Sequence, residues 1–328
     1  GWIPLGGYVK ISGMIDESMD TEQMALPPQP WEFRSKPAWQ RLIIMLGGVI
    51  VNFVLGIFIY IMLMYSYGEN FLPNKNVNQN GGVWVQDSLA IDLGLKTGDK
   101  ILTVDGNEVR KFNSLPVEFI NGDKYTIERN GAVIQKDIPV DFISKLIERG
   151  KNEGPFLYPR VPFLIAKIAD ESLNKGVDLK IKDEITGING TPIKYYDEAK
   201  EILKTYKNQD ITISIKRENV IKEVPVKISP DGKLGFYPIS QITDLEKLGY
   251  YQLENNEYTF AEAIPAGIDK SWSTLTGYIK QLKKIFNPST GAYKGLGGFI
   301  SIGSIFPSEW SAESFWNITA FLSIMLGF

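Results

Sequence analysis

The residue types that most often carry out enzymatic chemistry are missing from this sequence. Its 328 residues include no histidine and no cysteine. The chain therefore has no imidazole to act as a general base or zinc ligand, and no thiol to form a disulfide or bind a metal. The 35 basic and 38 acidic residues leave a formal charge of −3, which gives no indication of a nucleic-acid partner. Chemistry in which this chain takes part must proceed without an imidazole of its own.

One strongly polar side chain, Asn52, interrupts a long apolar segment. Residues 42–68 carry no charge, and about 20 apolar residues suffice to cross the hydrocarbon core of a bilayer. Trp39 at one end and Tyr65 and Tyr67 at the other suit the two headgroup levels. The pattern predicts a transmembrane helix over 42–68, with a buried core helix as the alternative. An amide in hydrocarbon needs a hydrogen-bond partner, so we expect Asn52 to contact either another helix or a bound peptide.

The charges that flank this segment predict its orientation. Arg34, Lys36 and Arg41 precede it, whereas Glu69 follows it. Because cytoplasmic loops carry an excess of basic residues, we expect residues 1–41 in the cytoplasm and the residues after 69 on the opposite side of the membrane.

A glycine-rich turn lies near the start of the chain. Gly6 and Gly7 stand beside a short alternating run made of Tyr8, Val9 and Lys10. Such a pattern predicts a hairpin or an edge strand.

The middle of the chain contains an internal repeat. The first copy includes GLKTGDKILTVDGNEV (residues 94–109), and the second includes VDLKIKDEITGINGTPI (residues 177–193). Each has a short apolar strand that turns at Asp-Gly (105–106) or Asn-Gly (189–190). These dipeptides tolerate the positive φ angles of a type I′ turn, so each copy is predicted to form a β-hairpin.

Both copies continue in the same way. Alternating strands are predicted at residues 124–140 and 210–226, and a helix is predicted near residues 195–208 in the second copy only, because the first copy is shorter there. Lys182 stands where the first copy has glycine, so we expect an altered entry into the second hairpin.

The C-terminal part begins with an amphipathic segment. Residues 258–287 carry apolar side chains at helical intervals and lysines late in the segment, which predicts a helix lying on the membrane surface, with a core-packing helix as the alternative. The last apolar run, residues 314–328, is shorter than a membrane span. The first residues contain no initiator methionine. We therefore expect the chain to be a fragment of a longer protein.

The order of these segments resembles that of a known family. The motif GLKTGDKILTVDG is similar to the hairpin of bacterial PDZ domains. IPLGGYVK, GGVIVNF, the two repeats, the amphipathic segment and GGFISI follow one another along nearly the whole chain. This arrangement resembles the site-2 protease family, and within it the bacterial regulator of sigma-E protease (RseP-type) intramembrane zinc metalloproteases. It implies a multi-domain membrane protein with α-helical transmembrane segments and two inserted PDZ-like domains of the α+β or β class.

The resemblance also implies where the catalytic residues would be. Family members carry an HExxH helix before a loop like IPLGGYVK and an LDG motif after a segment like FLSIMLGF, and these motifs supply the zinc ligands. None of those ligands lies within residues 1–328. We therefore expect a central fragment of a zinc endopeptidase that is inactive alone, with no catalytic residue and no metal ligand in this chain.

The resemblance also implies that residues of this chain take part in substrate handling. Residues 6–10 match the loop against which a transmembrane substrate is unwound and paired as a strand, with a reversing loop that binds nothing as the alternative. Asn52 matches the asparagine of the family's G-x-x-x-N pattern, where a structural hydrogen bond and a substrate contact both remain open. The two PDZ-like domains would exclude substrates with large outer domains, or bind peptides in their grooves.

These implications give the following organisation. The expected parts are a cytoplasmic loop with an edge-strand hairpin (1–41), a transmembrane helix (42–68), two PDZ-like domains (81–142 and 155–240), an amphipathic membrane-surface helix (258–287), and a re-entry segment with a truncated transmembrane helix (295–328). The expected partners are the bilayer and transmembrane substrates such as anti-sigma factors or remnant signal peptides, and the expected location is the inner membrane, crossed several times, with the PDZ-like domains outside the cytoplasm. A non-catalytic membrane-anchored PDZ scaffold or pseudoprotease is the alternative.

The edge-strand role can be tested by changing one residue. Val9→Pro removes a backbone N–H from the proposed strand, so cleavage of a transmembrane substrate by the full-length protein should slow while the repeats remain folded by circular dichroism. Unchanged cleavage would contradict the role.

Overall fold

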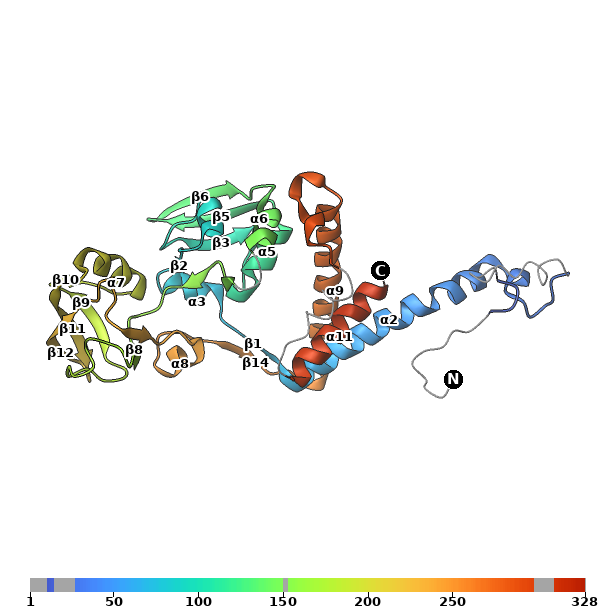
Figure 1. Cartoon of the computed structure of the whole chain (residues 1–328). Coiled ribbons are helices and arrows are strands. Elements are labelled where there is room, and N and C mark those ends of the chain that lie inside the picture. Colours follow the sequence, from blue (N-terminus) through green and yellow to red (C-terminus); the bar gives the residue numbers. More distant parts are fainter. Residues whose placement is uncertain (1–10, 15–26, 150–152, 298–309, 328) are drawn as a thin grey trace. The chain divides into compact units, whose positions relative to one another are not determined.

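A computed structural model describes residues 11–14, 27–149, 153–297 and 310–327 (Figure 1). They divide into two compact units, a helical unit and a mixed unit that contains the sheets. The helical unit comprises η1 (Phe33–Ser35), α2 (Ala38–Tyr67), the first part of α9 (Phe260–Ile285) and α11 (Ala312–Gly327).

The long helix α2 is the predicted transmembrane segment. Of the described residues, α2 is the one helix both long and apolar enough to cross a membrane. Its apolar side chains are largely exposed: Val51, Val54 and Phe58 keep 63, 61 and 57% of their surface. The core helix of a soluble protein would bury such side chains, so the exposure favours lipid as their surroundings.

The mixed unit is built from two repeats with the same sheet. We call residues 82–161 the first repeat and residues 163–239 the second. The first contains a four-stranded sheet in the order β4-β3-β5-β6 and the second one in the order β10-β9-β11-β12 (Figure 1). The strands of the first repeat are β2 (Val83–Trp84), β3 (Lys100–Val104), β4 (Asn107–Glu108), β5 (Lys124–Arg129), β6 (Ala132–Asp137) and β7 (Tyr158–Pro159); those of the second are β8 (Ile165–Ile168), β9 (Glu184–Ile188), β10 (Thr191–Pro192), β11 (Asp210–Arg217), β12 (Val220–Lys227) and β13 (Phe236–Pro238).

Helices and short flanking elements complete the unit. The first repeat has α4 (Ser88–Asp92), η2 (Phe112–Ser114), α5 (Leu115–Asn121) and α6 (Phe142–Arg149); the second has α7 (Tyr196–Leu203) and η4 (Lys204–Tyr206). The flanking elements are β1 (Glu69–Phe71), α3 (Asn74–Gln79), α8 (Ile242–Lys247), β14 (Glu254–Asn256), η5 (Pro288–Thr290) and η6 (Ala292–Gly295). The helix predicted in the second copy is therefore present, but the first copy has a helix of similar length, α5, which the sequence pattern missed.

The two hairpin turns are those predicted from the dipeptides. Asp105 and Gly106 have φ angles of 49° and 79°, and Asn189 and Gly190 have 50° and 80°. Two consecutive positive φ angles define the type I′ turn, whose twist matches that of the flanking strands. The internal repeat is thus visible as two hairpins of the same type.

A buried ion pair occupies the same place in both repeats. Asp99 is fully buried and accepts two hydrogen bonds of 2.7 Å from Arg129 and one of 2.8 Å from Lys96 N–H. In the second repeat Asp183 is 2% exposed and accepts the equivalent bonds from Arg217 (2.7 Å twice) and Lys180 N–H (2.8 Å). Each pair ties the turn before the hairpin to the neighbouring strand.

Lys182 does not alter the entry into the second hairpin. It has a φ angle of +73° and so takes the left-handed conformation that Gly98 takes in the first repeat at +91°. Its N–H donates to Ile165 C=O at 2.7 Å, as Gly98 N–H donates to Val83 C=O at 2.9 Å. The expectation of an altered entry was wrong, because the surrounding hydrogen bonds hold a lysine in a conformation usually left to glycine.

The first repeat continues beyond residue 142, where its sequence pattern ended. β7 pairs with β2, with Pro159 opposite Val83, and Phe156, Leu157 and Val161 belong to the core of the first sheet. The sequence boundaries place residues 155–161 in the second domain, but strand pairing and burial place them with the first.

The Arg217 pair predicts a pH effect. Burial by itself would raise the pKa of Asp183, but hydrogen bonds from Arg217 and Lys180 N–H outweigh it and hold this pKa below its ordinary value. A carboxylate with a lowered pKa stabilises the fold above its unfolded-state pKa, and that stability is lost as the pH falls through the folded-state pKa. Arg217→Met should therefore lower the stability at neutral pH and move acid unfolding to higher pH, as followed by circular dichroism. Lys204→Met, which breaks the exposed pair with Glu201, should change neither, and equal effects of the two substitutions would contradict the prediction.

Candidate functional site

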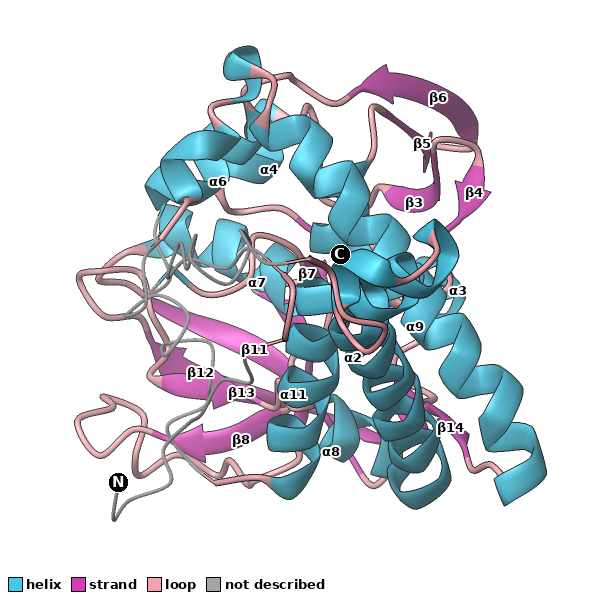
Figure 2. Ribbon diagram, turned by 90° about the vertical axis from the view of Figure 1, so that its right-hand side faces the viewer, coloured by secondary structure: helices cyan, strands magenta, loops and turns pink. Residues whose placement is uncertain are grey.

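The helical unit contains the one predicted site residue that the structure describes. α2 and α11 pack side by side and antiparallel, because Phe53 lies against Gly327 whereas Gly56, one turn further along α2, lies against Ile324 (Figures 1 and 2). A Cβ atom at Gly56 would come within 2.8 Å of Ile324 and 3.2 Å of the Ala320 carbonyl oxygen. Glycine is what allows the helices to approach this closely.

Asn52 lies on α2 one turn before this contact. It is half-buried and precedes Phe53, whose ring packs on Gly327 near the end of α11. Within the described parts of the chain, no hydrogen bond involves the Asn52 side chain. Asn52 thus lies one turn of α2 before Gly56, which packs against Ile324 of α11, and no hydrogen-bond partner of its amide is among the residues described.

The other predicted site residues, Gly6, Gly7, Tyr8, Val9 and Lys10, lie outside the described residues. The edge strand stays a prediction from the sequence.

A second helix packs on α2 through small residues. Ala263, Gly267 and Ser271 are the buried residues of α9, and they recur every four positions along one face. A Cβ atom at Gly267 would lie 2.6 Å from backbone atoms of Ile61 on α2. This stripe was missed in the sequence, where only the apolar positions of the segment were used, although small residues four apart are a signal of close helix packing.

A neighbouring face of α9 is apolar and exposed. Phe260, Ile264, Ile268 and Trp272 recur every four residues and keep 54, 40, 49 and 64% of their surface. A helix with one face on α2 and an exposed apolar face is compatible with contact with lipid. The predicted helix over 258–287 is therefore present as α9, and its position at the membrane surface stays a prediction.

The described residues offer no ligand set for zinc. The sequence has no histidine or cysteine, and no group of three acidic side chains in the described ranges is placed to hold a metal ion.

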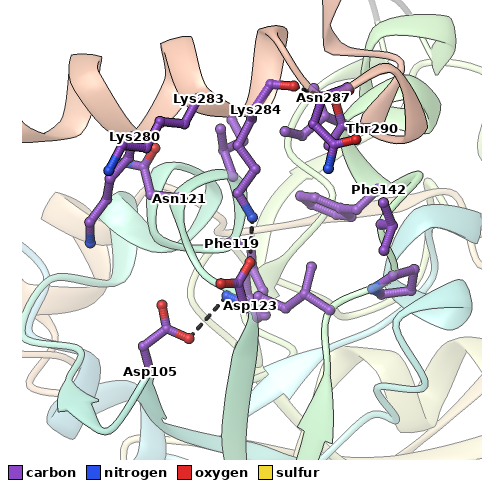
Figure 3. A pocket seen from close by; sticks show the side chains of 15 residues that line it. Asp105, Phe119, Asn121, Asp123, Phe142, Lys280, Lys283, Lys284, Asn287 and Thr290 are labelled. Atoms are coloured by element: carbon purple, nitrogen blue, oxygen red, sulfur yellow. Dashed lines mark hydrogen bonds and ion pairs between the residues drawn. The ribbon is translucent and has the colours of Figure 1, made fainter.

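A pocket of about 370 Å³ lies beside α5 (Figure 3). Phe119 and Phe142 form part of its apolar wall, and Lys280, Lys283 and Lys284 of α9 lie along its rim. Lys284 donates to Asp123 at 2.6 Å and to the Gly122 carbonyl oxygen at 2.9 Å. These bonds fix the last turn of α9 against the first repeat.

Arg160 joins the two repeats. Its guanidinium donates to Asp197 at 2.6 Å and to Glu198 at 2.8 Å, both on α7, and stacks over the Tyr195 ring at 3.9 Å. Asp197 is 6% exposed, so the pair is shielded from water and holds the first repeat to the second.

The described residues thus contain an apolar helix able to span a membrane, two helices packed on it through small residues, and a duplicated sheet module. The chain belongs to peptidase family M50, the site-2 protease family, whose model matches residues 1–328.

Relatives from several bacteria support this assignment. The chain is similar to the regulator of sigma-E protease RseP of Escherichia coli strain K12, with 25% identity over 346 residues that cover 99% of this chain and 73% of the relative. It is similar to the metalloprotease MmpA of Caulobacter vibrioides, with 27% identity over 155 residues that cover 40% of this chain and 36% of the relative. A relative from Bartonella henselae, named as a proposed zinc metalloprotease, is 31% identical over 156 residues, which cover 46% of this chain and 41% of the relative. The chain thus matches less than half the length of some relatives and about three quarters of others.

The glycine contacts predict opposite effects of one substitution at two sites. Gly267→Ala should destabilise the protein by about 1–3 kcal/mol, because its Cβ would overlap Ile61. Gly48→Ala should be neutral or stabilising by up to about 1 kcal/mol, because nothing lies within 4 Å of its Cβ and alanine favours the helix. Thermal unfolding in detergent at one scan rate measures both. A midpoint that falls equally in both variants would contradict the proposed packing.

Proposed function

We propose that this chain is the substrate-handling part of an intramembrane zinc endopeptidase that cleaves transmembrane anti-sigma factors or remnant signal peptides. The observation that carries the proposal is that Asn52 lies on α2 one turn before Gly56, which packs against Ile324 of α11, in a chain of the M50 family. The names of similar proteins, regulator of sigma-E protease among them, support transmembrane anti-sigma factors as the substrate class.

The position of Asn52 fits a role near the catalytic centre. In the family resemblance, the LDG motif follows a segment like FLSIMLGF, of which residues 321–327 form the end of α11 here. Asn52 lies one turn of α2 before the Gly56 contact and next to Phe53, which touches Gly327. Its amide can then hydrogen-bond a substrate peptide that has been unwound in lipid, where lost backbone bonds have no water to replace them. The loop of residues 6–10 would supply the edge strand for the same peptide.

The zinc ligands would come from sequence outside residues 1–328. An HExxH helix and an LDG motif supply them in the resemblance, and the described residues contain no alternative set. The chain alone would therefore be inactive, and it would shape substrate entry around a metal centre built elsewhere.

The repeats would control access from outside the cytoplasm. The basic residues before α2 favour a cytoplasmic N-terminal side, so the mixed unit would face the other side of an inner membrane that the whole protein crosses several times. Two PDZ-like domains linked by Arg160 would form an obstacle that excludes substrates with large outer domains. α9 would lie at the membrane surface with Trp272 toward lipid.

A membrane-anchored PDZ scaffold or pseudoprotease is the second candidate. The absence of histidine favours it only if the sequence preceding residue 1 also lacks HExxH. The zinc content of the complete protein distinguishes the two, since the scaffold would bind none.

Asn52 provides the functional test. Asn52→Leu in the full-length, zinc-loaded protein should slow cleavage of a reporter with a transmembrane segment about tenfold, the loss expected for one hydrogen bond in lipid of about 1–2 kcal/mol. Asn317→Leu makes the same chemical change at an exposed position of α11 and should leave cleavage unchanged. Equal cleavage rates for both variants would contradict the role of Asn52.

A further inference from the structure

The pocket beside α5 combines an apolar wall with a cationic rim (Figure 3). Its volume of about 370 Å³ lies in the range of pockets that take small molecules. All of its lining residues belong to the mixed unit. Three lysines and two aspartates are the charged groups of the lining, which leaves it with a net charge of +1.

Three of these five charged groups are engaged within the chain. Lys284 donates to Asp123 at 2.6 Å, so these two charges offset each other. Asp105 accepts hydrogen bonds from Asp123 N–H and Lys124 N–H at 3.0 and 2.9 Å, and such bonds stabilise a carboxylate. Both aspartates therefore have their partners already.

The other two lysines of the rim have no acceptor. Lys280 and Lys283 lie three residues apart on α9, and both are exposed. Within the described ranges of the chain, no hydrogen bond or ion pair involves either ammonium group. A lysine ammonium group has three donors and no acceptor. The rim therefore presents two cations to an anion that the chain itself does not supply.

A buried amide oxygen in the same pocket lacks a donor. Asn121 is the last residue of α5 and lines the pocket together with Lys280 and Lys283 (Figure 3). Its Oδ1 is buried and has no hydrogen-bond partner among the described residues. A buried acceptor left without a donor is unfavourable. A ligand that satisfies it brings an O–H or N–H group close to the anion held by the lysines.

The remaining wall of the pocket is made of carbon. It is formed by side chains from α5, from the segment after β6 and from α6: Phe119, Ile120, Ile138, Val140, Phe142 and Ile143. Val140 keeps 60% of its surface. A ligand that covers this wall removes apolar surface from water, so the pocket suits a group with both an anionic and an apolar part.

The first half of α9 indicates where such a group comes from. The Phe260 ring lies 5.7 Å from that of Tyr65, and Gly267 packs on Ile61, both within the last two turns of α2. Tyrosines at the end of a transmembrane helix lie at the level of the lipid headgroups. The two free lysines follow on the same helix. We therefore take the phosphate of a membrane lipid as the first source of the anion.

We propose that the pocket between α5 and the end of α9 binds a phosphoglycerol group. The phosphate lies on Lys280 and Lys283, a glycerol hydroxyl donates to Asn121 Oδ1, and the adjoining carbon atoms cover the apolar wall. The headgroup of phosphatidylglycerol has this chemistry, and so does free glycerol phosphate. This binding involves neither zinc nor cleavage, so its failure would leave the proposed function standing.

Lipid titration of the full chain tests the site. In a non-ionic detergent, native mass spectrometry measures the binding of three dioleoyl lipids: phosphatidylglycerol, phosphatidylmethanol, which has the same charge without the hydroxyls, and phosphatidylcholine. The first bound lipid should favour phosphatidylglycerol over phosphatidylmethanol about fivefold, as one hydrogen bond allows, and over phosphatidylcholine more strongly. Equal affinity for phosphatidylglycerol and either of the other lipids would overturn the proposal.

Two variants separate the phosphate contact from the hydroxyl contact. Lys280→Gln with Lys283→Gln should weaken phosphatidylglycerol binding about 25-fold, roughly fivefold for each lysine. Asn121→Leu should abolish the preference over phosphatidylmethanol and keep that over phosphatidylcholine. Lys207→Gln with Lys216→Gln removes the same charge from exposed positions of the second repeat and should change neither. An equal loss in this control, or an unchanged preference in Asn121→Leu, would contradict the assigned contacts.

A single cysteine locates the bound lipid, because the chain has none of its own. Val140 lines the pocket, whereas Val133 lies on β6 outside it, and they keep 60 and 68% of their surface. Phosphatidylglycerol at twice its Kd leaves one third of the sites free, so N-ethylmaleimide should react with Val140→Cys about threefold more slowly. Its reaction with Val133→Cys should not change. Protection of both thiols, or of neither, would rule out this pocket.

Soluble glycerol phosphate distinguishes the two sources of the group. If it protects Val140→Cys as the lipid does, the pocket recognises the phosphoglycerol group alone. Protection by phosphatidylglycerol only assigns the pocket to a membrane lipid whose acyl carbons contribute, and protection by glycerol phosphate only assigns it to a free phosphate ester. Absence of protection by both compounds would overturn the proposal.

Discussion

The geometry of each repeat depends on one buried ion pair, Asp99 with Arg129 and Asp183 with Arg217. A buried carboxylate is tolerated only when its hydrogen bonds are satisfied, and here the arginine and a backbone N–H satisfy it together. The pair joins the turn before the hairpin to a strand 30 or more residues later in the chain. β2 and β8 form hydrogen bonds with the backbone of the same turns. The ion pair therefore also fixes β2 and β8, which pair with β7 and β13. The shared frame makes the two repeats comparable position by position.

The two repeats differ in the segment that precedes their last strand, β7 or β13. The first repeat carries α6 between its sheet and β7, whereas the second passes from β12 to β13 through a short glycine-containing loop. In the first repeat an aromatic side chain, Phe142, is buried between α5 and the segment that leads into β7. The second repeat has a pocket of about 370 Å³ beside α7 and β13, and Arg160 links the two repeats.

The helical unit is held by a different force. Lipid tails are as apolar as the side chains of a protein core, so the hydrophobic effect does not drive helices together in a membrane. Their association depends instead on close packing and polar contacts. Gly56 and Gly267 provide the close approach, each at a point where a methyl group would overlap a neighbouring helix. Ser271, in the same stripe as Gly267, donates to the Gly267 carbonyl oxygen at 2.7 Å and so leaves no unsatisfied hydroxyl. Two polar groups of α2, the Asn52 amide and the buried Arg41 Nε, have no hydrogen-bond partner among the described residues.

The sequence by itself determined the features that depend on neighbouring residues. Asp-Gly and Asn-Gly specify their turns through local backbone preference, and the uncharged run of α2 and the periodicity of α7 and α9 specify their helices. The family, too, could be recognised from short motifs in order, and the family model confirms it. The tertiary structure alone decided the rest: the ion pair between Asp183 and Arg217, the left-handed Lys182 and the placement of Phe142 between Phe119 and Phe156. Each of these joins residues distant in the chain or imposes a backbone conformation against local preference, and only the packed fold supplies the energy to do so.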